Sequence, residues 1–264
     1  MAGPATAESG ARQQESSGPP LVRRLGPRRL RTIIIIALAV VLLGAGSTWL
    51  LYGSEWLRLK HVSVSGTAVL TPAQVREAAA VPVGSPLVSV DTDAIEQRLR
   101  ERLRRIDSVE VTRSWPDGIG LEVTERTPVV LVRKGRDFVE VDEEGVRFAT
   151  VSQAPEGVPL LESAPSPSSS AAASLRRFGE GRLVREAVRT VRALPPSVAR
   201  ATRVVKVRSY DDISLELSGG RTVAWGSAED GAAKSRTILA LMKASPDARH
   251  FDVSVPTAPA SARS

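Results

Sequence analysis

The sequence predicts an α+β protein that one helix anchors in a membrane. Residues 33–52 contain no charged side chain over about twenty positions, the length that a helix needs to cross the hydrocarbon core of a bilayer. Beyond this run, short stretches of alternating apolar and polar residues are interspersed with stretches of helical periodicity. We therefore expect a disordered tail (1–31), a transmembrane helix (32–52) and two α+β domains, of which the second is richer in strands.

The residues that flank the span predict its orientation. Up to about residue 26 the tail is rich in Gly, Pro, Ser, Gln and Glu, which is typical of disorder. Five arginines crowd the near end of the span: Arg23, Arg24, Arg28, Arg29 and Arg31. Because basic residues next to a span stay cytoplasmic, we expect a single-pass type II protein whose C-terminal part is extracytoplasmic. A cleavable signal peptide is the alternative, but its apolar segment would be shorter and its basic segment closer to Met1.

The distribution of charge argues against a nucleic-acid-binding protein. The formal net charge is +7, but residues 1–31 hold six arginines and two glutamates, which leaves thirty basic and twenty-seven acidic residues for the rest. The part beyond the span is nearly balanced and has few aromatic residues to stack on bases. The chain has no cysteine, which excludes disulfides and cysteine-based metal sites.

The first domain beyond the span is expected at residues 57–126. Residues 57–66 alternate apolar and polar side chains and stop at a glycine, as a short strand does. The sequence TPAQ at 71–74 predicts a helix start, with Thr as N-cap, Pro at the first helical position and Gln completing a capping box. Prolines and a glycine in residues 81–90 predict a loop.

A second helix is predicted after Asp91 or Asp93, either of which can cap it. Its buried face is expected to contain Ile95, Leu99, Leu103 and Ile106. The other faces carry five arginines: Arg98, Arg100, Arg102, Arg104 and Arg105. A solvated helix face is the simplest interpretation of these arginines, and contact with anionic lipid or wall polymer is the alternative.

A hairpin completes the first domain. Residues 109–114 and 119–123 alternate as strands, and the sequence Trp-Pro-Asp-Gly at 115–118 has the chemistry of a tight turn. The resulting order is strand, helix, helix, strand, strand. Each helix has one apolar face with which to cover the sheet, so this order is sufficient for a complete small domain.

The second domain is expected at residues 127–256. It begins with short strands at 129–132, 138–141 and 146–148, which are separated by charged, glycine-containing turns. Residues 154–173 are rich in Pro, Ser and Ala and predict an exposed loop.

The rest of the second domain adds two helices and more strands. One helix presents Leu183, Ala187, Val191 and Leu194 on its apolar face and stops at Pro195. Strands are predicted at 203–208, 213–217 and 222–225, followed by a helix capped by Ser227. Residues 250–255 predict the last strand, and residues 257–264 a frayed, disordered tail.

The sequence contains no recognisable catalytic or metal-binding set. His61 and His250 lie far apart beside strands, and structural roles explain them best. Serine-hydrolase, metalloprotease and phosphate-loop motifs are absent. Asp91–Asp93 and Asp142–Glu144 hint at cation binding, but helix capping and turn chemistry account for them. We therefore expect no enzyme activity, no cofactor and no small-molecule substrate.

Several of these stretches resemble the POTRA (polypeptide-transport-associated) domain of the bacterial cell-division family FtsQ/DivIB. They are VSVSG at 62–66, DTDAIEQRL at 91–99 and VEVTRSWPDGIGLEVTERTPV at 109–129. Downstream, FVEVDEEGVRF at 138–148 and FDVSVP at 251–256 resemble a hairpin and the terminal strand of the same family. The Pro/Ser/Ala-rich stretch at 154–173 departs from the pattern and leaves the spacing of the second domain open.

The resemblance implies where partners bind. In FtsQ-like proteins the last strands and the helix before them receive the division proteins FtsB and FtsL, while the POTRA domain and the span help recruitment to the division site. Carried over residue by residue, this points to Arg249, Phe251, Val253 and Val255, with Ser235 and Lys243 on the preceding helix. The alternative is that these residues simply close the β-rich domain.

The implied function is a bitopic scaffold at the division septum, which binds other division proteins outside the membrane and links ring assembly to septal peptidoglycan synthesis. One alternative is a POTRA-containing transport or chaperone component that binds extended client segments. Another is a membrane-anchored wall enzyme, which would need a nucleophile or metal set that the sequence lacks.

Overall fold

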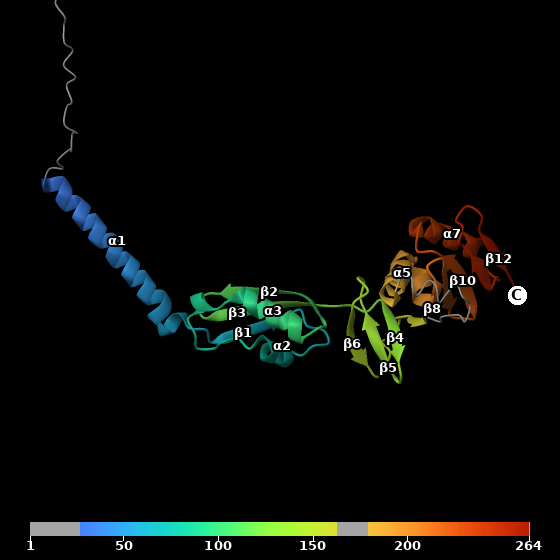
Figure 1. Cartoon of the computed structure of the whole chain (residues 1–264), viewed down its shortest axis with the longest axis horizontal. Helices are drawn as coiled ribbons and strands as arrows, with labels where there is room; N and C mark the ends of the chain where they lie inside the picture. The colour runs from blue at the N-terminus through green and yellow to red at the C-terminus, as the bar shows by residue number, and fades with distance from the viewer. Residues whose placement is uncertain (1–26, 163–178, 264) are drawn as a thin grey trace, which may run out of the picture. The chain divides into compact units, whose positions relative to one another are not determined.

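The computed structural model describes residues 27–162 and 179–263 (Figure 1). The tail predicted to be disordered up to residue 26 and most of the loop predicted at 154–173 lie outside the described residues. The chain divides into two compact units, Met1–Ser54 and Glu55–Ser264.

The first unit contains the apolar helix α1, Pro27–Gly53. Its segment Arg31–Gly53 has a mean hydropathy of 2.4, which makes it the one helix among the described residues that is long and apolar enough to cross a membrane. The apolar side chains from Ile33 to Tyr52 are exposed over most of this length, as a lipid-facing helix requires.

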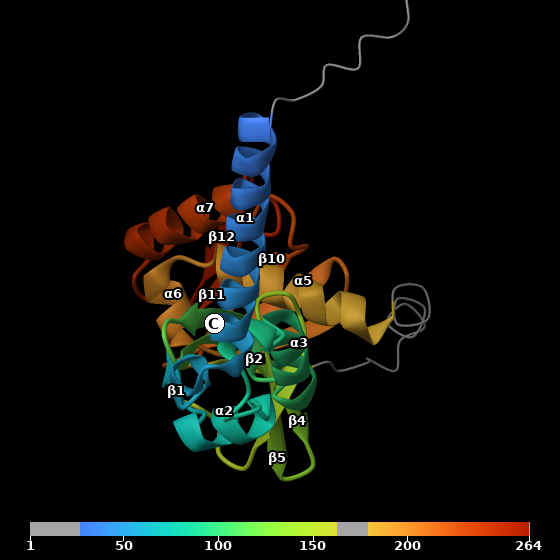
Figure 2. The ribbon, with the colours of Figure 1, turned by 90° about the vertical axis from the view of Figure 1, so that its left-hand side faces the viewer.

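The second unit begins with a three-stranded sheet in the order β1-β3-β2. Its elements are η1 Glu55–Leu57, β1 His61–Ser65, α2 Pro72–Ala79, η2 Leu87–Ser89, α3 Thr92–Arg102, β2 Ile106–Ser114 and β3 Gly118–Glu125. Strand β3 pairs parallel with β1 and antiparallel with β2. Helices α2 and α3 lie next to each other and contact β1 and β2, respectively (Figure 2). The strand-helix-helix-strand-strand order predicted from the sequence is confirmed.

Local sequence explains both helices of this region. Thr71 and Gln74 form the predicted capping box, in which each side chain bonds the backbone N–H of the other residue. Asp91, not Asp93, is the N-cap of α3. The predicted helix face was too long at its end, because α3 stops at Arg102 and Ile106 is the first residue of β2. Ile106 still packs into the same core, which is why the apolar spacing continued past the end of the helix.

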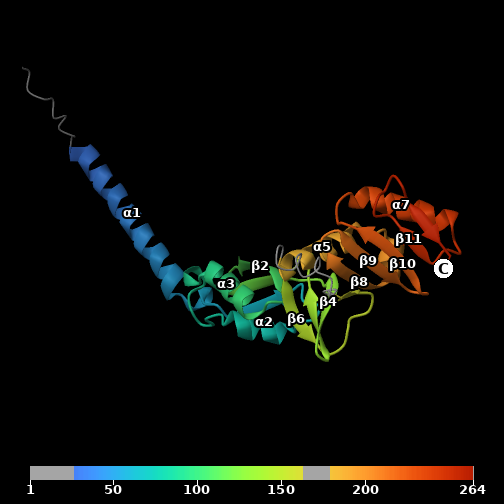
Figure 3. The same ribbon diagram turned by 45° about the vertical axis from the view of Figure 1, so that its right-hand side comes forward.

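The larger sheet has nine strands in the order β12-β11-β10-β9-β8-β7-β4-β5-β6. The strands are β4 Val130–Lys134, β5 Asp137–Val141, β6 Arg147–Val151, β7 Leu160–Glu162, β8 Thr202–Ser209, β9 Asp212–Leu217, β10 Arg221–Gly226, β11 His250–Asp252 and β12 Ala260–Ala262. The described helices of this region are α5 Glu180–Ala193, α6 Pro196–Ala201 and α7 Gly231–Ala244. Helices α5 and α7 contact each other and lie on the same side of strands β8–β11 (Figure 3).

Three predictions for this region need correction. Strand β7 lies inside the predicted loop, where Leu160 and Leu161 pair with both β4 and β8. Helix α6 was not predicted; Pro195 and Pro196 end α5 as expected, but Pro196 then starts this short helix, as a proline at the first helical position can. The N-cap position of α7 is occupied by Asp230 and not by Ser227, and the Asp230 side chain makes no capping hydrogen bond.

The fourth correction concerns the C-terminus. Residues 257–264 were predicted to be a frayed tail, but Ala260–Ala262 forms β12, which pairs antiparallel with β11. Turns reverse the chain between the two strands: Ser254 N–H donates to the Asp252 carboxylate at 2.9 Å, and Ala258 N–H donates to the Val255 carbonyl at 3.0 Å. Three small residues carry no periodic signal, so this strand depends on pairing that the local sequence does not show.

Candidate partner-binding edge

The predicted binding residues surround the end of the large sheet at which the chain terminates. Strand β11 lies between β10, to which it is parallel, and β12, to which it is antiparallel. Strand β12 is the last in the sheet order. Among the described residues, therefore, no strand pairs with its outer edge, and all three of its side chains are exposed. We call this outer edge the β12 edge.

Phe251 and Val253 belong to the interior of the sheet. Both side chains are buried, and Val253 is 0 % exposed. The Val253 N–H donates to the Ala224 carbonyl of β10 at 3.0 Å. The strand predicted at 250–255 is shorter in the structure, and β11, His250–Asp252, is not a sheet edge because it has neighbours on both sides.

The other four predicted residues divide into two groups. Arg249, Lys243 and Val255 are exposed, and Val255 retains 54 % of its surface. The Ser235 hydroxyl, in contrast, donates to the Ala193 carbonyl at the end of α5, so it holds α7 against α5. The six residues thus do not form one cluster of side chains.

Sequence reasoning missed the residues that form the edge itself. Arg249 N–H donates to the Ala262 carbonyl at 2.9 Å, and Ser261 Oγ donates to Ser245 Oγ at 3.1 Å. These bonds hold β12 to β11 and to the end of α7. The only sequence signals were Pro256 and Pro259, which mark turns and were interpreted as the start of a frayed tail.

A buried lysine supports the helix beside this edge. Lys234, in the first turn of α7, is 1 % exposed, and its Nζ donates to the Ser227 carbonyl at 2.8 Å. Burial lowers the pKa of Lys234 below its ordinary value, and the nearby carboxylates of Asp230 and Glu229 oppose that shift. Ser227 was predicted to cap the helix. Instead, its carbonyl accepts a hydrogen bond from Lys234 and thereby holds the first turn of α7.

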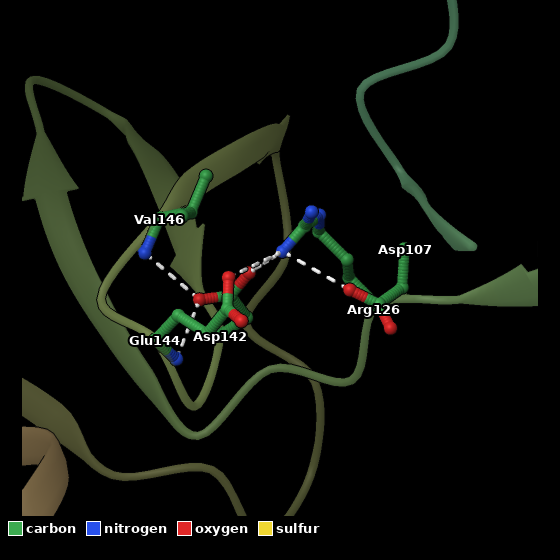
Figure 4. A network of polar contacts seen from close by, with 5 residues as sticks. All are labelled: Asp107, Arg126, Asp142, Glu144 and Val146. Atoms are coloured by element: carbon green, nitrogen blue, oxygen red, sulfur yellow. Dashed lines mark hydrogen bonds and ion pairs between the residues drawn. The ribbon is translucent and has the colours of Figure 1, made fainter. Parts of the chain in front are cut away.

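A charged network joins the two sheets (Figure 4). Arg126, just after β3, donates from Nη1 to the carboxylate of Asp142, and Nη1 lies 3.3 Å from Asp107 Oδ1 and 3.6 Å from Glu144 Oε2. Asp142 also accepts from the N–H groups of Glu144 and Val146, at 2.9 and 2.8 Å. Burial lowers the pKa of Arg126, but its hydrogen bond to Asp142 and the neighbouring carboxylates outweigh burial, so the pKa is raised.

The network has the features of a structural junction. A second pair, Arg105 Nη2 and Glu140 Oε2 at 2.5 Å, joins the same two sheets, and both side chains are largely buried. No group of three or more His, Cys, Asp or Glu side chains within the described residues could hold a metal ion. The two histidines lie in different sheets: His61 is 3.5 Å from Asp117, and His250 Nδ1 is 2.7 Å from the Thr222 hydroxyl.

Comparisons with known proteins cover nearly all of the chain. A family model described as "POTRA domain, FtsQ-type" matches residues 57–126, and one described as "Cell division protein FtsQ/DivIB, C-terminal" matches residues 130–254. The chain is 74% identical over 264 residues to the cell division protein FtsQ of Streptomyces coelicolor, with 100% of both chains covered.

More distant relatives have the same printed name. The FtsQ of Streptomyces venezuelae is 54% identical over 275 residues, covering 100% of this chain and 99% of that protein. The FtsQ of Mycolicibacterium smegmatis is 32% identical over 232 residues, covering 86% of this chain and 64% of that protein. A solved structure of the major extracytoplasmic domain of DivIB from Geobacillus stearothermophilus has 19% identity and a TM-score of 0.33, and covers 46% of this chain and 94% of that domain.

Proposed function

Because the chain belongs to the FtsQ/DivIB family of bacterial cell-division proteins, we propose that it is a bitopic scaffold of the division complex. FtsQ is a non-enzymatic division protein, so the function is expected to lie in binding. In this proposal α1 fixes the chain in the membrane, residues 57–126 and 127–256 act as two extracytoplasmic domains, and the assembly links ring position to septal peptidoglycan synthesis.

The proposed orientation has residues 1–31 in the cytoplasm. The five arginines before the span support it, because basic residues next to a span stay on the cytoplasmic side. Labelling intact cells with a thiol reagent tests it, since the chain has no cysteine of its own. A cysteine introduced at Gly219, in the β9–β10 turn, should react with a membrane-impermeant reagent, whereas one at Ser16 should react only after the cells are opened.

The observation that carries the binding proposal is the position of β12 at the end of the nine-stranded sheet. An open edge presents backbone N–H and C=O groups to which an extended segment of a partner can add a strand. We propose that outer segments of FtsB-like and FtsL-like division proteins pair with the β12 edge. Lys243, Arg249 and Val255 are exposed and would contact the partner at the rim of this edge.

Truncation of the C-terminus tests the edge. The full chain in detergent and a variant lacking residues 258–264 are compared for binding to the outer segments of both partners, with the fold checked by circular dichroism. A chain lacking only residues 263 and 264 is the matched control, because it retains all of β12. Loss of binding only in the longer truncation supports the proposal.

The other outcomes of this experiment are equally informative. Unchanged binding by the folded longer truncation would rule out the β12 edge. Tighter binding would mean that β12 covers the site and that the partner pairs with β11 in its place. Val253→Pro does not make this distinction, because it removes an interior hydrogen bond to Ala224 and should unfold the sheet.

The two alternative functions have no comparable support. Three relatives that match 100% of this chain are each named as cell division protein FtsQ. Septal placement of a fluorescent fusion would agree with the division scaffold, and uniform placement around the cell would contradict it.

A further inference from the structure

Among the described residues, four large apolar side chains of the first domain are exposed, and three of them come from segments that meet at one end of the small sheet. Trp56, Val83 and Trp115 expose 69 %, 64 % and 53 % of their surfaces. They come from three separate segments: η1, the loop between α2 and η2, and the turn between β2 and β3. Large apolar side chains grouped on one surface usually mark a contact with another apolar phase.

Backbone hydrogen bonds gather these three segments at one end of the small sheet. The Leu59 carbonyl accepts from Gly84 N–H at 2.8 Å, and Leu59 N–H donates to the Ser85 carbonyl at 2.9 Å. The Asp117 carbonyl accepts from the N–H groups of Lys60 and His61, at 2.8 and 3.2 Å. Val83 is next to Gly84, and Trp115 is two residues before Asp117. Both Gly84 and Asp117 are hydrogen-bonded to residues 59–61, which follow Trp56 closely in the chain. We call this surface the tryptophan end.

The tryptophan end is also the end at which the chain enters the domain. Gly53 is the last residue of α1 and Glu55 the first of η1, so Ser54 alone connects them. Strand β1 starts at His61, which pairs with Gly118 at the start of β3. A domain attached to a span by one residue keeps its attached end within reach of the bilayer interface.

The chemistry of this end fits the interfacial layer of a bilayer. Tryptophan is enriched at that depth because its indole ring is apolar and its N–H is polar. Lys60 is exposed beside it and can keep its ammonium in water while its methylenes lie along the lipid. Arg58 is tied to the domain, since Nη1 donates to the Gly84 carbonyl at 2.9 Å. The acidic groups nearby are Glu55 and Asp117, and Asp117 lies 3.5 Å from His61.

We propose that the tryptophan end is a lipid-contacting surface, with Val83 and Trp115 inserted in the interfacial layer on the side of the membrane where the domains lie. The contact would fix the tilt of the first domain relative to the membrane and thereby the direction in which the rest of the protein extends. The inference requires the membrane anchor but does not depend on partner binding at the β12 edge.

The small sheet supplies a matched control residue. Val69 exposes 65 % of its surface, nearly the same as Val83, and lies at the opposite end of the sheet. Its N–H donates to the carboxylate of Glu125, the last residue of β3, at 3.0 Å. Since β3 has eight residues, the two ends are roughly 25 Å apart.

The test uses the full chain reconstituted in vesicles of phosphatidylethanolamine and phosphatidylglycerol. Because the chain has no cysteine, Val83→Cys, Val69→Cys and Leu43→Cys each carry a single nitroxide label. Collision with oxygen, which concentrates in lipid, is compared with collision with a water-soluble nickel chelate. We expect the oxygen-to-nickel ratio to be several-fold higher at position 83 than at position 69, and highest at position 43 within the span.

The possible results separate the inference from the proposed anchor. A low ratio at position 83 with a high ratio at position 43 would overturn the lipid contact and leave the anchor intact. A low ratio at position 43 would mean that the span is not inserted and would overturn both. A label at position 83 shielded from both reagents would indicate a protein neighbour and would also overturn the inference.

Tryptophan fluorescence gives a second measurement on the native Trp115 side chain. In a variant with Trp49→Phe and Trp56→Phe, the remaining tryptophans are Trp115 and the buried Trp225. Brominated lipids should quench this variant markedly more than one that also carries Trp115→Phe, in which only Trp225 emits. Equal quenching of the two variants would place Trp115 outside the lipid and overturn the proposal.

Discussion

The Nζ of Lys234 donates to the Ser227 carbonyl at 2.8 Å from a position that is almost fully buried. This bond closes the segment between β10 and α7 and fixes the first turn of the helix beside the β12 edge. The cost of burying the ammonium makes the stability of the domain depend on pH.

We expect the stability of the wild-type chain, relative to Lys234→Met, to increase as the pH rises toward 10.5, the ordinary pKa of lysine. Because the pKa of Lys234 is lowered in the folded state, the unfolded chain binds more protons between the folded pKa and 10.5, so raising the pH favours folding. The slope cannot exceed about 1.4 kcal/mol per pH unit. Urea unfolding of the full chain in detergent at several pH values measures it.

Lys243→Met, on the exposed part of the same helix, controls for the loss of one lysine. A difference between wild type and Lys234→Met that stays constant or falls with pH would contradict the lowered pKa.

The stability of the junction between the two sheets should depend on the Arg126 side chain. We expect Arg126→Gln to destabilise the chain by about 3 kcal/mol, because it leaves the buried carboxylate of Asp142 without its guanidinium partner. Asp107→Asn should cost less than about 1 kcal/mol, since that carboxylate is about half exposed and screened by water. Unfolding midpoints of the two variants, measured side by side, provide the check. Equal losses would mean that Asp142 is not the main partner of Arg126.

Replacing threonine by valine should change the stability of the chain in opposite directions at two buried positions. The Thr190 hydroxyl, in α5, has no hydrogen-bond partner among the described residues, whereas Thr202 Oγ1 donates to the Val198 carbonyl at 2.8 Å. Thr190→Val should therefore stabilise the chain by about 1 kcal/mol, and Thr202→Val should destabilise it by about 1 kcal/mol. Thermal and urea unfolding of both variants test this. A loss of stability in Thr190→Val would indicate a hydrogen bond or water at that hydroxyl.

Substitutions at Gly66 and Gly219 distinguish the cost of a left-handed backbone from the cost of a steric clash. Both have a positive φ, +79° and +78°. A Cβ at Gly66 would lie 2.1 Å from the Val123 carbonyl oxygen, whereas a Cβ at Gly219 would meet no atom of the described residues within 4 Å. Gly219→Ala should cost about 1 kcal/mol from the left-handed backbone alone, and Gly66→Ala several kcal/mol more because β3 must shift. Similar losses in the two variants would contradict the close approach.

The structural features predicted best from the sequence are those that depend only on residues close together in the chain. The capping box of Thr71 and Gln74 could be identified because all its atoms come from four consecutive residues. The hairpin of β2 and β3 could be identified because a turn joins two alternating strands directly. The resemblance to the FtsQ/DivIB family rested on the same stretches, and the family models confirm it.

The sequence did not predict strands whose pairing partners lie far away along the chain or give no local signal. Leu160 and Leu161 form β7 only because β4 and β8 supply hydrogen bonds on both sides, and β8 begins some forty residues later. Ala260–Ala262 is a strand only because β11 lies beside it. The prediction of the candidate site was affected most, because the order of all the strands in the sheet decides which strand lies at its edge.

Strand β7 also determines how the protein would respond to mechanical force. If the chain is held in the membrane at one end and by partners at the C-terminal edge, tension must pass from β4 to β8. That path crosses two registered residue pairs between β4 and β7 and three between β7 and β8, all in parallel strands. Helix α5 contacts both β4 and β8 and gives a second connection between them. A pull that exceeds the strength of these few bonds would therefore part the large sheet at β7, while strands β4–β6 on one side and β8–β12 on the other remain paired.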